Sequence, residues 1–274
     1  MTIRFFTHKL VAHDSKYIVL PAYKGGQEGY KNLSIPNPCS EDSVQKYPIG
    51  TKFVDDDRVW RYMKAGNTCT RGRLVQSYNA YSSGTTREYA LIAIAGAVGD
   101  TTVTCTAQGT VTENMFAGGY IIVTSTGKLV YRIVSNTAAT PGNTFVVTLD
   151  QPLRNVILGT DYIQCIRDKY ADVRYFSGAP EAGYGSAVGA AHWTVTSGYY
   201  FWGQTWGPCS ITGIDNVGAS ISERGLVMGT DGAVKCEYTA GLQYIGYLIP
   251  YTGPSTGGVD MPAAWLLVEL QLAP

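Results

Sequence analysis

Hydrophobic and polar residues alternate with a period of two along much of the chain, in short runs that Gly, Pro and Asn interrupt. In the run at 58–65, Val59, Met63 and Ala65 fall on one face of an extended chain, and Trp60 and Tyr62 on the other. Between residues 90 and 175 such runs follow one another at intervals of about 8–12 residues. This spacing predicts short antiparallel strands in sandwich or barrel domains, an all-β fold. The strongest helical signal is one turn at 40–46, with Ser40 as its N-cap.

The densest apolar run lies at residues 199–211, where five aromatic side chains fall within eight residues and a Trp-Gly-Pro turn follows. In a strand, Tyr200, Trp202 and Trp206 share one face, and Tyr199 and Phe201 share the other. With both faces apolar, we expect this strand to be central in a sheet or partly covered by another chain. The same three residues, turned outward beside the 251–260 loop, would form a stacking platform for a sugar.

Breaks in the pattern divide the chain into three parts. Residues 1–49 form an extended N-terminal arm and a proline-rich segment, which must dock on the chain's own domain or on a neighbouring subunit. Residues 50–89 together with 180–274 form the main β-domain. Residues 90–179 form an inserted β-barrel or sandwich module.

Composition restricts the classes of partner. Lys and Arg number 21, and so do Asp and Glu, so the chain has no positive excess for nucleic-acid phosphates. Charged residues make up only 15%, and there are 20 Tyr, a balance typical of surfaces that other proteins cover. No apolar run reaches the roughly 20 residues that span a bilayer, and no secretion signal opens the chain. We expect neither nucleic acid nor a membrane as partner.

Catalytic and metal-binding motifs are missing from the sequence. His8, His13 and His192 lack the spacing of a metal site, and the triplet at 55–57 is typical of a solvated turn. The cysteines stand 27 or more residues apart without a CxxC motif, so we interpret them as reduced and mostly buried; they are Cys39, Cys69, Cys105, Cys165, Cys209 and Cys236. The sequence predicts no catalytic residue, no cofactor, no metal and no enzymatic activity.

Two stretches have a pattern that is found in a known group of proteins. The first is GTVTENMFAGGYIIV at 109–123 with YRIVSN at 131–136; the second is YFWGQTWGP at 200–208 with Gly225 and the final LLVEL at 266–270. Both resemble virion structural proteins of tailed bacteriophages. The resemblance extends from about residue 50 to the end and does not cover the arm. It implies a capsid decoration (cement) protein, of a kind that binds the outside of the shell, often as a trimer, braces it against internal DNA pressure and has no active site.

We therefore expect a structural virion protein that decorates and stabilises the capsid by binding the major capsid protein and itself, with a trimer favoured. It would be made in the host cytoplasm and lie on the capsid exterior. Two alternatives stay open: a tail or head-fibre protein that binds a host glycan, and a β-fold glycan hydrolase with two carboxylates. The residues expected to form core or assembly contacts are Phe5, Phe6, Tyr17, Trp60, Tyr200, Trp202, Trp206 and Trp265.

Overall fold

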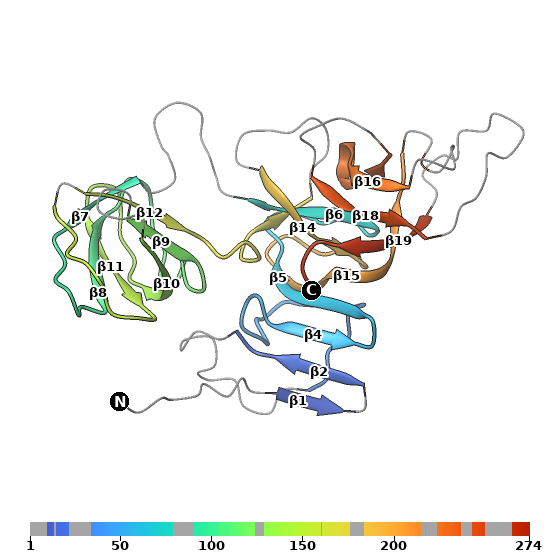
Figure 1. Cartoon of the computed structure of the whole chain (residues 1–274), viewed down its shortest axis with the longest axis horizontal. Helices are drawn as coiled ribbons and strands as arrows, with labels where there is room; N and C mark the ends of the chain where they lie inside the picture. Colours follow the sequence, from blue (N-terminus) through green and yellow to red (C-terminus); the bar gives the residue numbers. More distant parts are fainter. Residues whose placement is uncertain are drawn as a thin grey trace, which may run out of the picture.

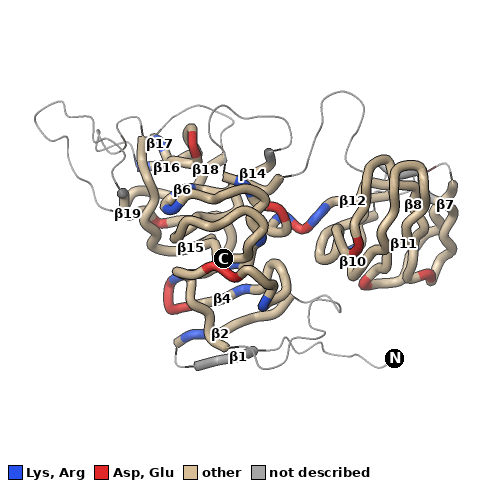
Figure 2. The backbone as a smooth tube through the Cα atoms, turned by 180° about the vertical axis from the view of Figure 1, so that it is seen from behind, with Lys and Arg blue, Asp and Glu red and all other residues tan. Residues whose placement is uncertain are grey.

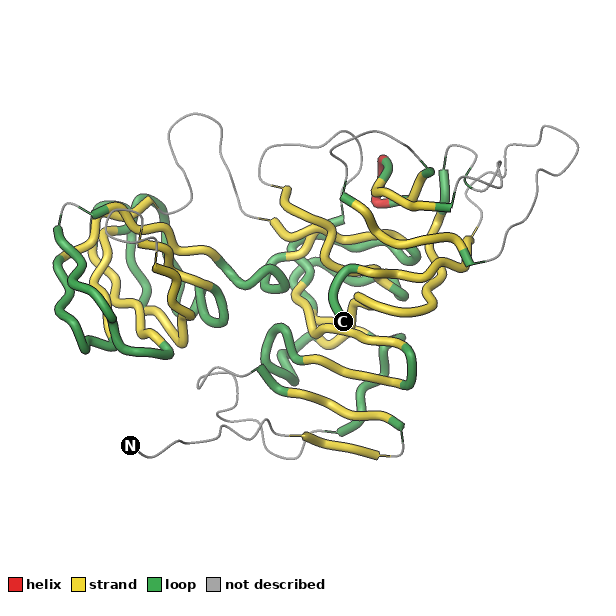
Figure 3. The backbone as a smooth tube through the Cα atoms, viewed as in Figure 1, coloured by secondary structure: helices red, strands yellow, loops and turns green. Residues whose placement is uncertain are grey.

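The computed structural model describes residues 10–13, 15–21, 34–78, 90–123, 129–159, 161–175, 184–214, 217, 224–236, 243–249 and 265–274. Within these ranges the chain is all-β, as predicted, with named strands that pair antiparallel and one short 3-10 helix, η2 (Thr230–Gly232). The strands form a 13-stranded sheet, called the large sheet below, and a separate closed barrel (Figures 1 and 3).

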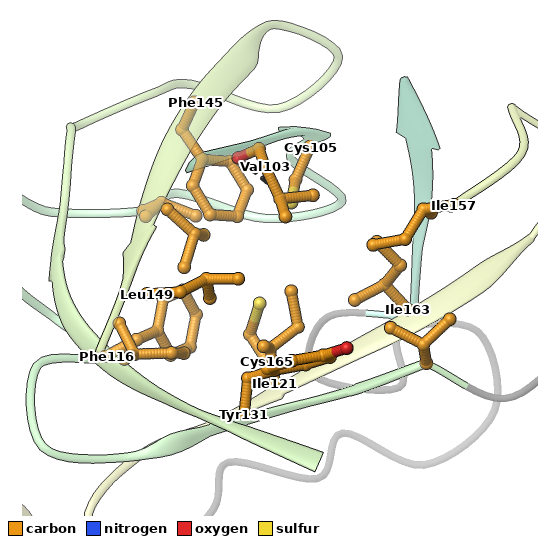
Figure 4. Close-up of a cluster of buried hydrophobic side chains, with 14 of the residues drawn as sticks. Val103, Cys105, Phe116, Ile121, Tyr131, Phe145, Leu149, Ile157, Ile163 and Cys165 are labelled. Carbon is orange, nitrogen blue, oxygen red and sulfur yellow. Dashed lines mark hydrogen bonds between the residues drawn. The ribbon is translucent and has the colours of Figure 1, made fainter. Parts of the chain in front are cut away.

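The barrel closes in the order β10-β11-β8-β7-β12-β9. Its strands are β7 (Ala90–Ile94), β8 (Thr102–Thr106), β9 (Tyr120–Val123), β10 (Leu129–Asn136), β11 (Thr144–Leu149) and β12 (Tyr162–Ile166). Alternation in β11 turns Phe145, Val147 and Leu149 inward, where they join Phe116 and Ile121 in a core of the barrel's own (Figure 4).

The large sheet follows the path β1-β2-β4-β5-β15-β19-β18-β16-β17, and β3, β6, β13 and β14 pair off this path. Its strands are β1 (Leu10–His13), β2 (Lys16–Val19), β3 (Glu41–Asp42), β4 (Lys52–Asp55), β5 (Arg58–Lys64), β6 (Arg73–Tyr78), β13 (Val173–Arg174), β14 (Tyr184–Ala191), β15 (Tyr200–Thr212), β16 (Gly225–Met228), β17 (Val234–Lys235), β18 (Tyr244–Leu248) and β19 (Trp265–Gln271).

Strand β15 is the centre of the large sheet. Its first half pairs with β5, β14 and β3, and its second half pairs with β19, with a register shift between Gln204 and Trp206. Phe201 packs with Met63 in one buried cluster, while Trp202 packs with Tyr62 in another. The prediction of a central strand with two buried faces is therefore confirmed.

The predicted helical turn at 40–46 is wrong, because Glu41 and Asp42 form strand β3 against the start of β15. The hydroxyl of Ser40 donates to the carbonyl of Asn37 and caps no helix. The Glu41 carboxylate accepts a hydrogen bond from the Thr196 backbone N–H at 2.6 Å, and the Tyr62 hydroxyl donates to the Asp42 carboxylate at 2.9 Å. These long-range hydrogen bonds hold the segment extended against its local preference.

Two of the predicted segments differ in the structure: the inserted module and the N-terminal arm. Strand β13 pairs with β6 of the large sheet, although the sequence placed residues up to 179 in the inserted module. In the predicted arm, β1 pairs with β2 and β2 pairs with β4, so the described part of the arm forms the edge of the large sheet. Residues 1–9 and 22–33 of that arm lie outside the described ranges.

Candidate functional site

The predicted aromatic residues of β5 and β15 lie mainly inside the protein. Trp60 and Trp202 are each 2% exposed. The ring centroid of Trp202 lies 5.0 Å from that of Tyr47, 5.1 Å from Tyr62 and 5.7 Å from Phe53. A sugar therefore has no access to the Trp202 ring, so the alternative hypothesis of a stacking platform is wrong at this residue. The 251–260 loop, the other part of that hypothesis, lies outside the described residues.

The other predicted contact residues have different positions. Tyr200 and Trp206 are half-buried on β15, and Tyr17 on β2 is 36% exposed. Trp265 begins β19, but its side chain lies outside the described part of the structure, as do Phe5 and Phe6. The structure therefore brings Trp60, Tyr200 and Trp202 together on neighbouring strands, while Tyr17 lies away from them on β2.

Cys209 and His192 form a thiol–imidazole pair that the sequence did not predict, with Sγ and Nε2 3.6 Å apart. Cys209 is 2% exposed, and burial raises the pKa of its thiol. Burial also lowers the pKa of His192. Both groups are thus held in their neutral forms, and a protonated thiol is a poor nucleophile. The pair is best explained as a buried structural contact.

Of the other cysteines, Cys69, Cys105 and Cys165 are also buried, whereas Cys39 is exposed and Cys236 is partly buried. The prediction of mostly buried cysteines therefore holds for four of the six, and all six are free thiols. Within the described ranges, no group of three or more His, Cys, Asp or Glu residues is arranged to hold a metal ion. The same part of the chain contains no helix of the length and apolar character that a bilayer crossing requires.

A cleft with a volume of about 920 Å³ lies between the barrel and the large sheet. Thr112, Glu113 and Asn114 line it from the barrel, and Lys64 and Tyr200 line it from the sheet. The segment that connects β12 to β13 contributes the third side. Pockets of this size are typical of ligand and peptide sites, so we treat this cleft as the candidate site.

A network of charged side chains lies along that third side. Both carboxylate oxygens of Asp172 accept hydrogen bonds from Arg174, at 3.0 and 3.3 Å, and Arg167 donates to Asp172 at 3.2 Å. The guanidinium of Arg174 also lies 3.5 Å above the centroid of the Tyr78 ring. A Cβ at Gly66 would come within 1.7 Å of Asp172, so this glycine makes room for the network. The cations of the cleft are therefore held in fixed positions.

Lys64, the last residue of β5, adds a further cation to the cleft. Its ammonium lies 5.5 Å from the centroid of the Tyr200 ring, a favourable cation–π distance. The Tyr200 ring stacks in turn on Tyr62, with centroids 5.9 Å apart and an angle of 8° between the planes. The cleft therefore carries a net positive charge. Its lining contains three cations, Lys64, Arg167 and Arg174, and two carboxylates, Asp172 and Glu113.

A buried carboxylate, Asp168, joins the barrel to the large sheet beside this cleft. Its side chain is only 8% exposed and lies 3.8 Å from the guanidinium of Arg132 on β10. Burial raises the pKa of Asp168, although the backbone N–H of Tyr170, which it accepts at 2.9 Å, and the charge of Arg132 act in the opposite direction.

No protein-family model, curated protein or solved structure matches this chain.

The sequence did not predict the cleft. Its residues come from β5, from the barrel loop at 112–117 and from the segment after β12, which are far apart along the chain. The alternation in β5 placed Lys64 on the same face as Trp60 and Tyr62, but it did not indicate a cleft.

Proposed function

We propose that this protein is a structural component of a tailed-bacteriophage virion, a decoration protein that binds the major capsid protein and copies of itself on the capsid exterior. The proposal starts from the resemblance at 109–136 and 200–208. The observation that carries it further is that two groups of apolar side chains are exposed on strands and on the segments next to them. Exposed apolar groups that lie together are typical of protein–protein interfaces.

The first group, the barrel patch, consists of Ile94, Val98, Val156 and Leu158, which are 48–61% exposed. They lie on two segments that the backbone bridge between Gly96 and Ile157 joins. These segments lie near β7, on the side of the barrel away from the large sheet (Figure 1).

Two aspartates fix the backbone under the barrel patch. Asp100 accepts the backbone N–H of Ala97 at 2.8 Å, and Asp161 accepts that of Leu158 at 2.9 Å. The patch therefore needs little ordering when it binds a partner, which lowers the entropic cost of association.

The second group, the strand patch, consists of Tyr244, Tyr247, Ile249 and Leu267, which are 37–49% exposed. Tyr247 pairs with Glu269, and the Ile249 backbone N–H donates to Leu267 at 3.1 Å, so β18 and β19 carry the patch together. Two separate patches fit a decoration protein that contacts both the shell and a neighbouring copy.

The test uses purified protein and expanded, DNA-free capsids of the phage that encodes it, prepared without this protein. We expect the wild type to sediment with the capsids at saturating stoichiometry. The double variant Val98→Asp/Leu158→Asp should bind capsids at least about tenfold more weakly than the wild type. Two charges buried in an apolar contact should remove more than about 1.4 kcal/mol of binding free energy.

Val44→Asp is the matched control, because Val44 is 72% exposed and lies outside both patches. It should bind capsids like the wild type. A wild-type protein that does not bind expanded capsids would overturn the proposed function. Equal binding by the double variant would remove the barrel patch from the account.

A further inference from the structure

Strand β5 connects two regions of opposite charge. The turn at 55–57 precedes it with three aspartates, and Lys64 ends it at the cleft between the barrel and the large sheet. At about 3.3 Å per residue, the eight steps from Asp56 to Lys64 span about 25 Å. The acidic turn of one molecule therefore does not reach its own cleft, but it can reach the cleft of a second copy.

The backbone of the acidic turn is held in place. Asp55 pairs with Lys16 at 3.1 Å and with Arg58 at 3.4 Å, while Asp56 and Asp57 are exposed. Asp56 adopts a positive φ of 56°, which aspartate tolerates better than most residues. A Cβ at Gly207 would lie 2.3 Å from the carbonyl oxygen of Asp57, so the backbone of the turn packs directly on β15.

The cleft presents complementary chemistry. Its cations, Lys64, Arg167 and Arg174, outnumber its carboxylates, and the hydrogen bonds to Asp172 and the ring of Tyr200 hold them in place. Hydroxyl and amide groups from Thr112 and Asn114 complete the polar lining. A turn with a fixed backbone and two exposed carboxylates matches this lining in charge, and the backbone needs little reorganisation when it docks.

We propose that the turn at Asp55–Asp57 of one copy docks in the cleft of the next copy, in a head-to-tail contact. This inference rests on the self-association included in the proposed function. Figure 2 shows the acidic turn on the side of the large sheet away from the barrel, whereas the cleft adjoins the barrel. A contact between two different surfaces closes into a ring when its rotation permits and otherwise continues as a filament.

The test is sedimentation velocity on the purified full-length chain over a range of concentrations. We expect discrete oligomers for the wild type that dissociate as salt rises, because the contact is charged. Asp56→Lys/Asp57→Lys and Lys64→Glu should each raise the self-association Kd about tenfold or more. If Lys64→Glu does not fold, Lys64→Gln takes its place, because it removes the charge of Lys64 without reversing it.

The triple variant with all three charge reversals is the decisive arm, because it places Lys opposite Glu in the same contact. It should self-associate at least tenfold more tightly than Asp56→Lys/Asp57→Lys alone. Arg154→Glu, the same charge change on an exposed barrel residue, should behave like the wild type.

Three results would overturn the contact: a wild type that stays monomeric at every concentration, reversals that leave Kd unchanged, or a triple variant that shows no recovery. Capsid binding is measured separately on the same variants. A monomeric wild type that binds capsids would reject this contact and leave the proposed function intact. An oligomer that forms through this contact and binds no capsid would reject the proposed function alone.

Discussion

Truncating Trp202 to alanine should destabilise the large sheet and leave the barrel unchanged. Trp202 is 2% exposed and contacts three aromatic rings at centroid distances of 5.0 to 5.7 Å. Removing a buried Trp or Phe side chain costs about 3–5 kcal/mol, because burial is lost and a cavity remains. Against a typical stability of about 5–15 kcal/mol, this lowers the melting temperature of the sheet by roughly 6–20 °C.

The two parts of the molecule can be followed separately. All five tryptophans, Trp60, Trp193, Trp202, Trp206 and Trp265, lie outside the barrel sequence at 90–166, so tryptophan fluorescence reports on the large sheet alone. Far-UV circular dichroism also detects the barrel, which has its own core. Urea unfolding of Trp202→Ala should show an earlier fluorescence transition and an unmoved barrel transition.

Trp193→Ala is the matched control, because Trp193 is 48% exposed. Its free energy of unfolding should change by no more than about 0.5 kcal/mol. A loss in Trp202→Ala as small as that of the control would refute the burial argument. An equal shift of both transitions would refute the independence of the barrel core.

Three further predictions concern the barrel, its junction and a turn. Asn136→Asp removes two hydrogen bonds that the side-chain amide donates to backbone carbonyls at 2.9 Å, and it puts a charged acceptor in their place. The free energy of unfolding of the barrel should fall by about 3 kcal/mol, measured by urea unfolding at neutral pH. An unchanged midpoint would contradict this. Because burial raises the pKa of Asp168 above 3.8 in the folded state, that state binds the proton more tightly, and this group's contribution to stability grows as pH falls through the raised pKa towards 3.8. Asp168→Asn should lose that part of the pH dependence when unfolding is compared between neutral pH and about pH 4, and equal slopes would reject the assignment. Gly207 has a φ of 85°, and a Cβ there would clash with the backbone of Asp57, whereas Gly142 faces open space. Gly207→Ala should therefore lower the free energy of unfolding by about 3 kcal/mol and Gly142→Ala by about 1 kcal/mol. Equal losses by thermal unfolding would exclude the steric cause.

Alternation was enough to predict the strands with the strongest pattern. Tyr62 and Met63 on β5, and Phe201 and Trp202 on β15, take opposite faces of the sheet as the period of two requires. The two-sided burial of β15 was predicted from its aromatic content, because burying large apolar side chains on both faces is favourable.

Local pattern failed where distant residues decide the structure. Residues 41–42 became a strand because the carboxylates of Glu41 and Asp42 find partners on other elements. The cleft depends on Lys64 and Asp172, which lie on opposite sides of the barrel segment in the sequence and both line the cleft. Likewise, nothing local links Cys209 to His192.

The most direct test of the central claim is the composition of purified virions. Under the proposed function this chain is encoded by a tailed phage; particles of that phage are banded by density, and quantitative mass spectrometry compares the copy number of this protein with that of the major capsid protein. The account predicts that this protein is present at a fixed ratio to the shell subunit, with a copy number of the same order. Its absence from intact particles, or a copy number as low as that of a tail component, would contradict the account.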